Sequence, residues 1–546
     1  MTEKNLSRRR WLTAATVAAA PLMADPQTTS AIHGVRVYNI VEFGAKGDGK
    51  TLDTAALQAA VDACHKDQGG VVLVPAGVFV IGTVELRSNV TLRIAAGGKL
   101  LGSADGKQYH PAEAIPLTGD STLNDGNVGL LFAVNAENVT VEGPGTIDGQ
   151  GLQFRSPVRG TPPPSGRGGA DRPYHLLFHR CKHLRVRDLT LLDCAFHSIR
   201  VIQSSYVWMD GLHIHNRVNS NNDGFHFISC ERVHVTNCDV ETQDDACALF
   251  GTCKLVTVSD CTFSTRWSVF RFGGGNPEDV TVSNCVIYET FGCPIKLHFG
   301  PGSRAQNISF SNLTLHDVTG PISINLNTRR RDNATAPTAG GYLRNLSFSG
   351  IRGTVVGEAR QYQDMAFTQS YRPGETRQCI VLNALEGSTI ENVTFNDIRL
   401  TYGGGGTAEE AAREIPQVAG EYFEMGTPPA YGLYARNVRG LTLRDVRFEV
   451  EKPDVRPAIV LDHVSDADLG GVSAQGNPQA QAVVRMIETH DVLIASPRVL
   501  TPAAAFVAVE GAGTKGIVVD GGDVSKAATP VAASAGASRD AVKVRS

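Results

Sequence analysis

The sequence lacks three features that would place it in common functional classes. Its 51 Lys and Arg against 55 Asp and Glu give a formal net charge of −4, which argues against a nucleic-acid-binding surface. After residue 24, no apolar run reaches the length of a membrane span. No group of His and Cys residues has zinc-like spacing, and no calcium motif stands out. We therefore expect no metal, no cofactor, and no nucleic acid or membrane as a partner.

What the sequence does contain is a repeated phrase in which apolar and polar residues alternate. Copies begin at Leu184, Val207, Val233, Val256, Val280 and Ile308, so successive copies are 23, 26, 23, 24 and 28 residues apart. Looser copies begin at Val90, Val139, Leu346, Val393 and Leu441. A period of two predicts strands. Asn, Asp and Gly between the apolar positions supply the bends.

Repeats of this length predict a solenoid. The absence of a 3.6-residue period excludes a helical solenoid, and a propeller blade would need about 40 residues and four strands. The fold class that fits is all-β, a single parallel β-helix with three short strands per turn. We assign residues 34–525 to this one domain. We expect residues 526–546, rich in Ala, Ser and Val, to be disordered.

Two segments precede the coils. Residues 7–12 resemble a twin-arginine export signal, and a short apolar stretch follows, so we interpret residues 1–24 as a signal peptide. This predicts a protein that is soluble in the periplasm or secreted. From Asp53 onward, an N-cap residue and an apolar stripe predict a helix, which would cap the open end of the solenoid.

The cysteines follow the repeat instead of forming pairs. The chain has eleven, an odd number, and most lie within the repeated phrases. Cys238, Cys261 and Cys285 take the same place in successive phrases, where other phrases have leucine. We interpret these three as an inward-facing core stack and expect few or no disulfides.

Three carboxylates lie one repeat apart. Asp223 stands in Asn221-Asn222-Asp223-Gly224, and the pair Asp244-Asp245 follows one repeat later. Residues one repeat apart become neighbours on adjacent coils, about 4.8 Å from each other. Asp and Asn also favour simple turns, but adjacent carboxylates entering a strand are costly unless they have a role. Crowding raises the pKa of one carboxyl and keeps it protonated, which points to acid/base chemistry on a sugar.

These motifs stand in a recognisable setting. Three features resemble the pectinase-type right-handed β-helices. They are the Phe-Gly-Ala-Lys-Gly-Asp-Gly segment at 43–49, the capping helix and the Val74-Pro75-Ala76-Gly77 turn. The Asn-x-Asp-Gly and Asp-Asp motifs are similar to those of glycoside hydrolase family 28, the polygalacturonases and rhamnogalacturonan hydrolases, over about residues 36 to 460.

The resemblance implies an inverting hydrolase that acts on pectin-like polysaccharide. It implies that Asp244 is the general acid, that Asp223 and Asp245 hold the attacking water, and that Asn221 orients a carboxylate. We expect the enzyme to be a monomer.

The next two coils depart from the family pattern. The family usually has Gly-His-Gly one coil past the acid pair, but here the histidine's place falls near Ser268. One coil later the family has Arg-Ile-Lys, whereas this chain keeps Lys296 and has Pro294 in place of the arginine. Lysine is a poor substitute for arginine in gripping a carboxylate. The change weakens the case for plain polygalacturonan and leaves open rhamnogalacturonan, a decorated pectin, or another uronate or neutral-sugar linkage.

Three further residues are candidates for substrate contact. Arg271 is the candidate for supplying the missing cation, His226 for replacing the histidine, and Trp267 for stacking on a sugar face. His197 and His298 lie in the same coils, and we interpret them as groove or turn residues.

Segments 155–171, 361–376 and 403–427 have no repeat character, and we expect them to be loops over the cleft. Two other functions stay open at this point. One is a polysaccharide lyase or epimerase on the same fold, and the other is a non-catalytic glycan-binding β-helix.

Overall fold

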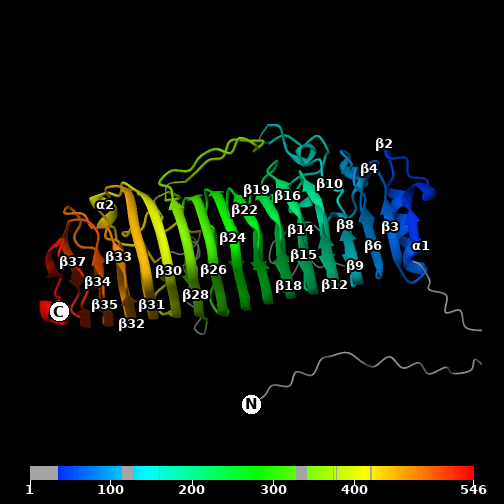
Figure 1. Cartoon of the computed structure of the whole chain (residues 1–546). Helices are drawn as coiled ribbons and strands as arrows, with labels where there is room; N and C mark the ends of the chain where they lie inside the picture. Colours follow the sequence, from blue (N-terminus) through cyan, green and yellow to red (C-terminus); the bar gives the residue numbers. More distant parts are fainter. Residues whose placement is uncertain are drawn as a thin grey trace, which may run out of the picture.

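The protein is a single elongated stack of parallel strands, as Figure 1 shows in colours that run from blue at α1 to red at the carboxyl end. The computed structural model describes residues 35–112, 127–158, 160–326, 341–372, 374–376, 378–417 and 421–545. The predicted parallel β-helix is confirmed. The predicted signal peptide, residues 1–24, lies outside the described residues. Among those residues, no helix combines the length and the apolar character that crossing a membrane requires.

The strands form three parallel faces, because each strand pairs with the strand one coil further along the chain. The first face contains β5 (Val84–Glu85), β8 (Gly129–Val134), β11 (Tyr174–His179), β14 (Ile199–Ile202), β17 (Phe225–Ile228), β20 (Cys247–Phe250), β23 (Phe270–Gly273), β25 (Ile295–Phe299), β27 (Ile322–Leu326), β29 (Ile380–Ala384), β34 (Val484–Ile487), β37 (Ala503–Glu510) and β39 (Ala527–Ser534).

The second face contains the predicted repeated phrases. Its strands are β1 (Val37–Asn39), β3 (Gly70–Val74), β6 (Val90–Ile94), β9 (Glu137–Glu142), β12 (Lys182–Arg187), β15 (Ser205–Asp210), β18 (Glu231–Thr236), β21 (Lys254–Ser259), β35 (His490–Ala495), β38 (Lys515–Asp520) and β40 (Val542–Arg545). The third face contains β2 (Asp48–Leu52), β4 (Gly77–Ile81), β7 (Gly98–Gly102), β10 (Thr146–Asp148), β13 (Thr190–Leu192), β16 (His213–Asn216), β19 (Asp239–Thr242), β22 (Thr262–Thr265), β33 (Ser473–Ala474) and β36 (Arg498–Val499).

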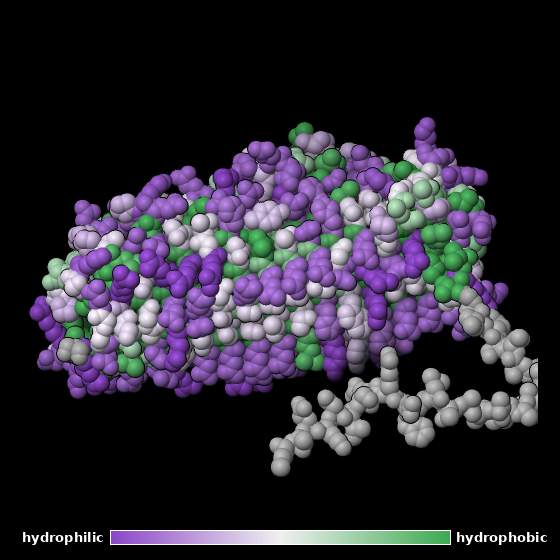
Figure 2. Space-filling view, viewed as in Figure 1, coloured by the Kyte–Doolittle hydropathy of each residue, from purple (hydrophilic) through white to green (hydrophobic). Residues whose placement is uncertain are grey.

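In the later coils one strand runs through more than one face. These longer strands are β24 (Glu278–Thr290), β26 (Arg304–Val318), β28 (Tyr342–Val355), β30 (Ile390–Gly404), β31 (Leu433–Lys452) and β32 (Ile459–Gly470). Along β24, buried residues alternate with exposed and half-buried ones, as the repeated phrase predicts. The face seen in Figure 2 is accordingly mostly hydrophilic along the body of the stack, with apolar atoms scattered between.

Short helices occur at the amino-terminal end and in the connections. They are α1 (Thr54–Lys66), α2 (Ala408–Ala411), η1 (Ile40–Phe43), η2 (Gly106–Gln108), η3 (Gly151–Phe154), η4 (Gly169–Asp171) and η5 (Arg539–Ala541). α1 packs against the first coils at the blue end of the stack, as predicted for a cap (Figure 1). Asp53 stands at its N-cap, but the carboxylate accepts hydrogen bonds from the backbone of Lys46 and Gly47 rather than capping the helix. It thereby fixes the turn that leads into the helix.

The tail differs from the prediction of disorder. β39 pairs with β37, and β40 pairs with β38, so residues beyond Lys526 add a further coil to the stack. The segment is rich in Ala, a weak strand former, but the exposed edge of the preceding coil offers its backbone a row of hydrogen-bond partners.

Stacked side chains fill the interior. Cys238, Cys261 and Cys285 are at most 2 % exposed, which confirms the predicted inward stack, and all eleven cysteines are buried and free. Further along, the rings of Phe310 and Phe348 are 5.3 Å apart, and those of Phe348 and Phe395 are 4.8 Å apart, nearly parallel in both pairs. Phe348 therefore packs against a ring in each neighbouring coil.

We expect Phe348→Ala to lower the free energy of unfolding by about 3–5 kcal/mol, because it leaves a cavity between two buried rings. The urea midpoint of unfolding measures the loss. Val286→Ala, at a position 42 % exposed, is the matched control and should change little. Equal shifts in the two variants would contradict the packing argument.

Candidate active site

The three predicted carboxylates lie at one edge of the stack, where the chain enters the first face. Asp223 precedes β17, and Asp244 and Asp245 precede β20. The two strands pair with Phe225 opposite Cys247. Backbone bonds continue the pairing into the turn: Gly224 N donates to Asp245 O (3.0 Å), and Asp244 N donates to Asn222 O (3.2 Å). The winding thus brings the two motifs together, as the repeat length predicts.

Asp244 is the most accessible of the three acids. Its side chain is half-buried, its Oδ1 accepts a hydrogen bond from the backbone N–H of Asp245 (2.9 Å), and its Oδ2 lies 3.4 Å from the exposed side-chain amide of Asn221. Burial, with the adjacent charge of Asp245, raises the pKa of Asp244 to about 7. The carboxyl can therefore hold a proton at neutral pH and deliver it to a group in the groove.

Asp245 is 7 % exposed. Within the described part of the chain, its Oδ1 has no hydrogen-bond partner. Burial raises the pKa of this carboxyl, while the positive charges of Lys296 and Arg271 act in the opposite direction. A buried carboxylate with an unsatisfied oxygen is rare in a structural role, and such groups concentrate where a protein performs chemistry.

Asp223 is held by two histidines. Its Oδ2 lies 2.7 Å from Nδ1 of His226 and 3.7 Å from Nε2 of His197, whose rings stack with centroids 4.5 Å apart. Burial lowers the pKa of both histidines well below the ordinary value, so both are neutral. His226 was predicted to contact substrate, but it is 1 % exposed and orients the carboxylate of Asp223 instead.

The same three ligand atoms lie within 4.8 Å of one another, which is close enough to hold a metal ion. However, the charge of Arg200 lowers the pKa of both histidines, so a guanidinium already acts on this cluster. A second cation would be repelled, and the cluster is better explained as the support of Asp223.

Asn221 is placed by Arg172. Asn221 has φ 54°, in the left-handed region that Asn adopts readily. The Arg172 guanidinium donates to the backbone oxygen of Ser220 (2.6 Å) and to Oδ1 of Asn221 (3.2 Å). The Asn221 amide nitrogen therefore points toward Asp244 and can donate a hydrogen bond to its carboxyl group.

Lys296 is predicted to contact the substrate, but its side chain does not reach the groove. Its side chain is 0 % exposed, and its Nζ lies 2.9 Å from Oε2 of Glu421 and 4.7 Å from the ring centroid of Trp267. Arg271 pairs with Lys296 across β23 and β25, and its Nη2 lies 3.4 Å from Oε1 of the same glutamate. Glu421 therefore pairs with both predicted substrate cations, and no motif in the sequence marks this glutamate as a site residue.

The similarity of the chain to known proteins agrees with this geometry. The sequence model for glycosyl hydrolases family 28 matches residues 64–419. The chain belongs to glycoside hydrolase family 28.

This family 28 hydrolase has plant relatives and shares its fold with a solved structure. It is 25 % identical over 390 residues to an exopolygalacturonase of Platanus acerifolia, a match that covers 69 % of this chain and 94 % of the relative. It is 30 % identical over 302 residues to a probable polygalacturonase of Vitis vinifera, which covers 51 % of this chain and 60 % of the relative. The family 28 exopolygalacturonase of Yersinia enterocolitica shares the fold with a TM-score of 0.56 at 19 % identity, over 80 % of this chain and 78 % of that one.

Trp267 also has a different environment from the one predicted for this hydrolase. Its ring is half-buried and meets Tyr422 and Phe423 edge-on, with centroids 6.2 and 6.0 Å away. The Arg266 guanidinium lies 5.2 Å from the ring centroid, in addition to Lys296. The indole packs against the segment that carries Glu421, and its stacking on a sugar stays a prediction. Ser268, at the place of the family's histidine, is fully buried.

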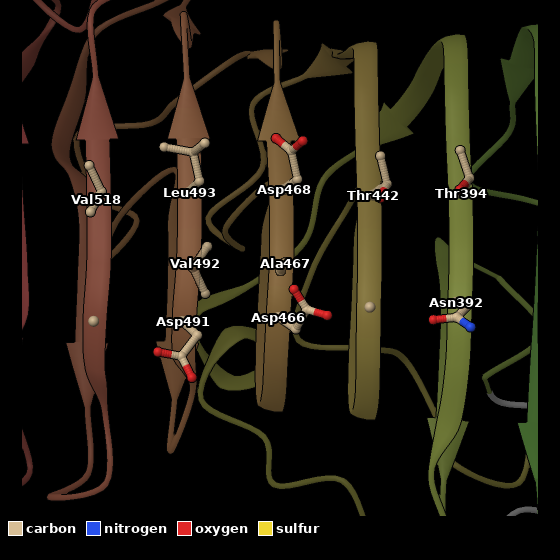
Figure 3. Close-up of a pocket in the computed structure, with 12 residues that line it drawn as sticks. Asn392, Thr394, Thr442, Asp466, Ala467, Asp468, Asp491, Val492, Leu493 and Val518 are labelled. Carbon is tan, nitrogen blue, oxygen red and sulfur yellow. The ribbon is translucent and has the colours of Figure 1, made fainter.

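Among the hollows on the described surface of the hydrolase, two lie on the stack. One of about 430 Å³ is lined by Arg155, Phe196 and Asn221, among others. The other, of about 540 Å³, lies on β30, β31, β32, β35 and β38 (Figure 3). Its Asn392, Asp466 and Asp491 have φ between 54° and 57°. They take the bend positions that recur in successive coils. The first hollow is the one linked to the acids, because its lining residue Asn221 also contacts Asp244.

Proposed function

We propose that this enzyme hydrolyses glycosidic bonds in pectin-like polysaccharide with inversion at the anomeric carbon. The observation that carries the proposal is the raised pKa of Asp244 beside Asp245, one coil from Asp223. The names of the two plant relatives, an exopolygalacturonase and a probable polygalacturonase, support a pectic substrate.

In the proposed reaction, Asp244 donates its proton to the glycosidic oxygen as the bond to the anomeric carbon breaks. A water molecule held by Asp223 and Asp245 attacks that carbon from the opposite face, and the carboxylates take its proton. Inverting enzymes need about 6.5–9.5 Å between acid and base to accommodate this water. Adjacent coils about 4.8 Å apart, with side chains that splay outward, can supply that separation. His226 keeps Asp223 in place throughout, because its neutral ring is hydrogen-bonded to the carboxylate.

A panel of pectic fragments tests the proposal. The purified protein is incubated with homogalacturonan, rhamnogalacturonan and xylogalacturonan fragments, and the products are analysed for size, reducing ends and anomeric configuration. Hydrolysis that releases the inverted anomer is expected. Retained configuration, or unsaturated products that absorb in the ultraviolet, would overturn the proposal, and the latter would indicate a lyase.

The rate should depend on pH through Asp244. Because the proposed acid must be protonated and its pKa is about 7, we expect kcat/KM to fall above pH 7, by about tenfold per pH unit. A pH–rate profile on whichever fragment is cleaved measures this limb. A profile that stays flat to pH 9 would contradict the assignment of Asp244 as the acid.

A further inference from the structure

Glu421 changes what the groove presents to a substrate. Its carboxylate contacts both cations that would otherwise grip a uronate, Lys296 at 2.9 Å and Arg271 at 3.4 Å. The side chain of Glu421 is 31 % exposed, that of Arg271 is 14 % exposed, and that of Lys296 is 0 % exposed. At this place a sugar therefore meets a carboxylate before it meets a cation.

The segment that carries Glu421 is anchored. Tyr422 and Phe423 are 2 % and 7 % exposed and pack with Cys293 and Trp267. The Arg372 guanidinium lies over the Phe423 ring, 4.7 Å from its centroid. Withdrawing Glu421 would leave the buried ammonium of Lys296 without its partner, which is costly. Glu421 is thus a permanent part of the groove and not a plug that substrate displaces.

Glu421 also lies beside the reacting groups. Its charge acts on the carboxyls of Asp244 and Asp245, whose pKa values it raises. Arg271 follows Ala248 of β20 in register on the first face, and Lys296 follows Arg271. Glu421 therefore lies one or two coils from the acid pair, about 5–10 Å along the stack. A sugar unit next to the one being cleaved can span this distance.

A count of charges shows how this place differs from a uronate site. At this place both Arg271 and Lys296 are already paired with the carboxylate of Glu421, and both also act on the carboxyl of Asp245. No excess positive charge is left for a substrate carboxylate. The oxygens of Glu421 accept hydrogen bonds, which sugar hydroxyls can donate.

We infer that the sugar unit seated against Glu421 is neutral and is recognised through its hydroxyl groups, so that the enzyme cuts pectic chains beside a neutral sugar and not between two uronates. This inference rests on the proposed function. A uronate at the same place would face the carboxylate of Glu421 and be rejected by like-charge repulsion.

The test compares two oligosaccharides of equal length, a galacturonate oligomer and a rhamnogalacturonan fragment in which neutral and acidic sugars alternate. Binding is measured by calorimetry in the Asp244→Asn protein, so that turnover does not interfere, with and without Glu421→Gln. Glu414→Gln, at an exposed position that precedes the buried Ile415, is the matched control. Cleavage by the wild-type enzyme is measured in parallel, with identification of the sugars on both sides of the cut.

We expect the Asp244→Asn protein to bind the alternating fragment at least tenfold more tightly than the galacturonate oligomer. Adding Glu421→Gln should shrink this preference about tenfold or reverse it, and Glu414→Gln should leave it unchanged. Equal binding of the two oligosaccharides, or a preference that Glu421→Gln leaves unchanged, would overturn the inference while leaving hydrolysis intact. Selective binding without any cleavage by the wild-type enzyme would instead refute the proposed function and keep the binding preference.

Discussion

Replacing Asp244 by asparagine should reduce kcat by about 10²–10⁴-fold while the Kd for substrate stays nearly constant, because the amide cannot donate a proton to the leaving oxygen. The change keeps the shape of the side chain and removes only the acid. Stopped assays of reducing ends measure the loss, and calorimetry measures the retained binding. A protein that only binds glycans would show the same affinity in both forms and no turnover in either.

The same substitution should also change stability in a direction that depends on pH. The pKa of Asp244 in the folded protein, about 7, lies above that of an ordinary aspartate. The folded state therefore binds the proton more tightly than the unfolded state, and the wild-type protein loses this stability as the pH rises from about 4, the ordinary aspartate value, to about 7. Asp244→Asn should then be the more stable protein at pH 8. Asp260→Asn, the same change in an exposed turn, is the control and should alter neither rate nor stability.

The repeat explains why much of this site could be predicted from the sequence. A winding chain with a fixed step brings Asp223 beside Asp244 and Asp245, because each coil repeats the previous one. The cysteine stack could be predicted from the same repeat length. Both predictions needed only local alternation and the repeat length, which the sequence displays directly.

The partners of Lys296 could not be predicted in this way. Glu421 lies 125 residues from Lys296 in the sequence, in a segment without repeat character. The repeat length therefore cannot predict that the two residues meet. Lys296 matches the family's substrate-binding lysine, but its burial depends on a loop of this particular chain. His226 was selected for its distance from Asp223, but its role depends on stacking with His197, one coil earlier.

A long segment after β28 also comes from outside the repeat, and it forms one edge of the groove. It runs back along the stack, as Figure 1 shows in yellow-green, and Ala366 N donates to Arg217 O (3.2 Å) several coils earlier. Near its end, Oε2 of Glu375 lies 2.8 Å from Nη2 of Arg266, and the two side chains are 1 % and 4 % exposed. The Tyr422 hydroxyl donates to the same carboxylate at 3.3 Å. One buried ion pair thus fastens both loops that surround the groove.

Glu375→Ala should release these loops, because it leaves the guanidinium of Arg266 buried without its counter-charge, at a cost of about 3–5 kcal/mol. Since each coil of a solenoid contacts only its neighbours, the loss should stay local. We expect rapid proteolysis and hydrogen exchange in segment 360–376, and a large fall in kcat/KM, while distant coils remain protected.

A double replacement decides whether charge or packing is responsible. Arg266→Met with Glu375→Leu removes both charges and keeps most of the volume, so protection of the segment should return. Glu391→Ala breaks an exposed pair with Arg439, whose side chain is 63 % exposed, and should cost less than about 1 kcal/mol. If Glu375→Ala behaves like this surface control, the loops are held by their aromatic contacts instead. The position of Glu421 would then depend on its ion pairs with Lys296 and Arg271 and on the packing of Tyr422 and Phe423.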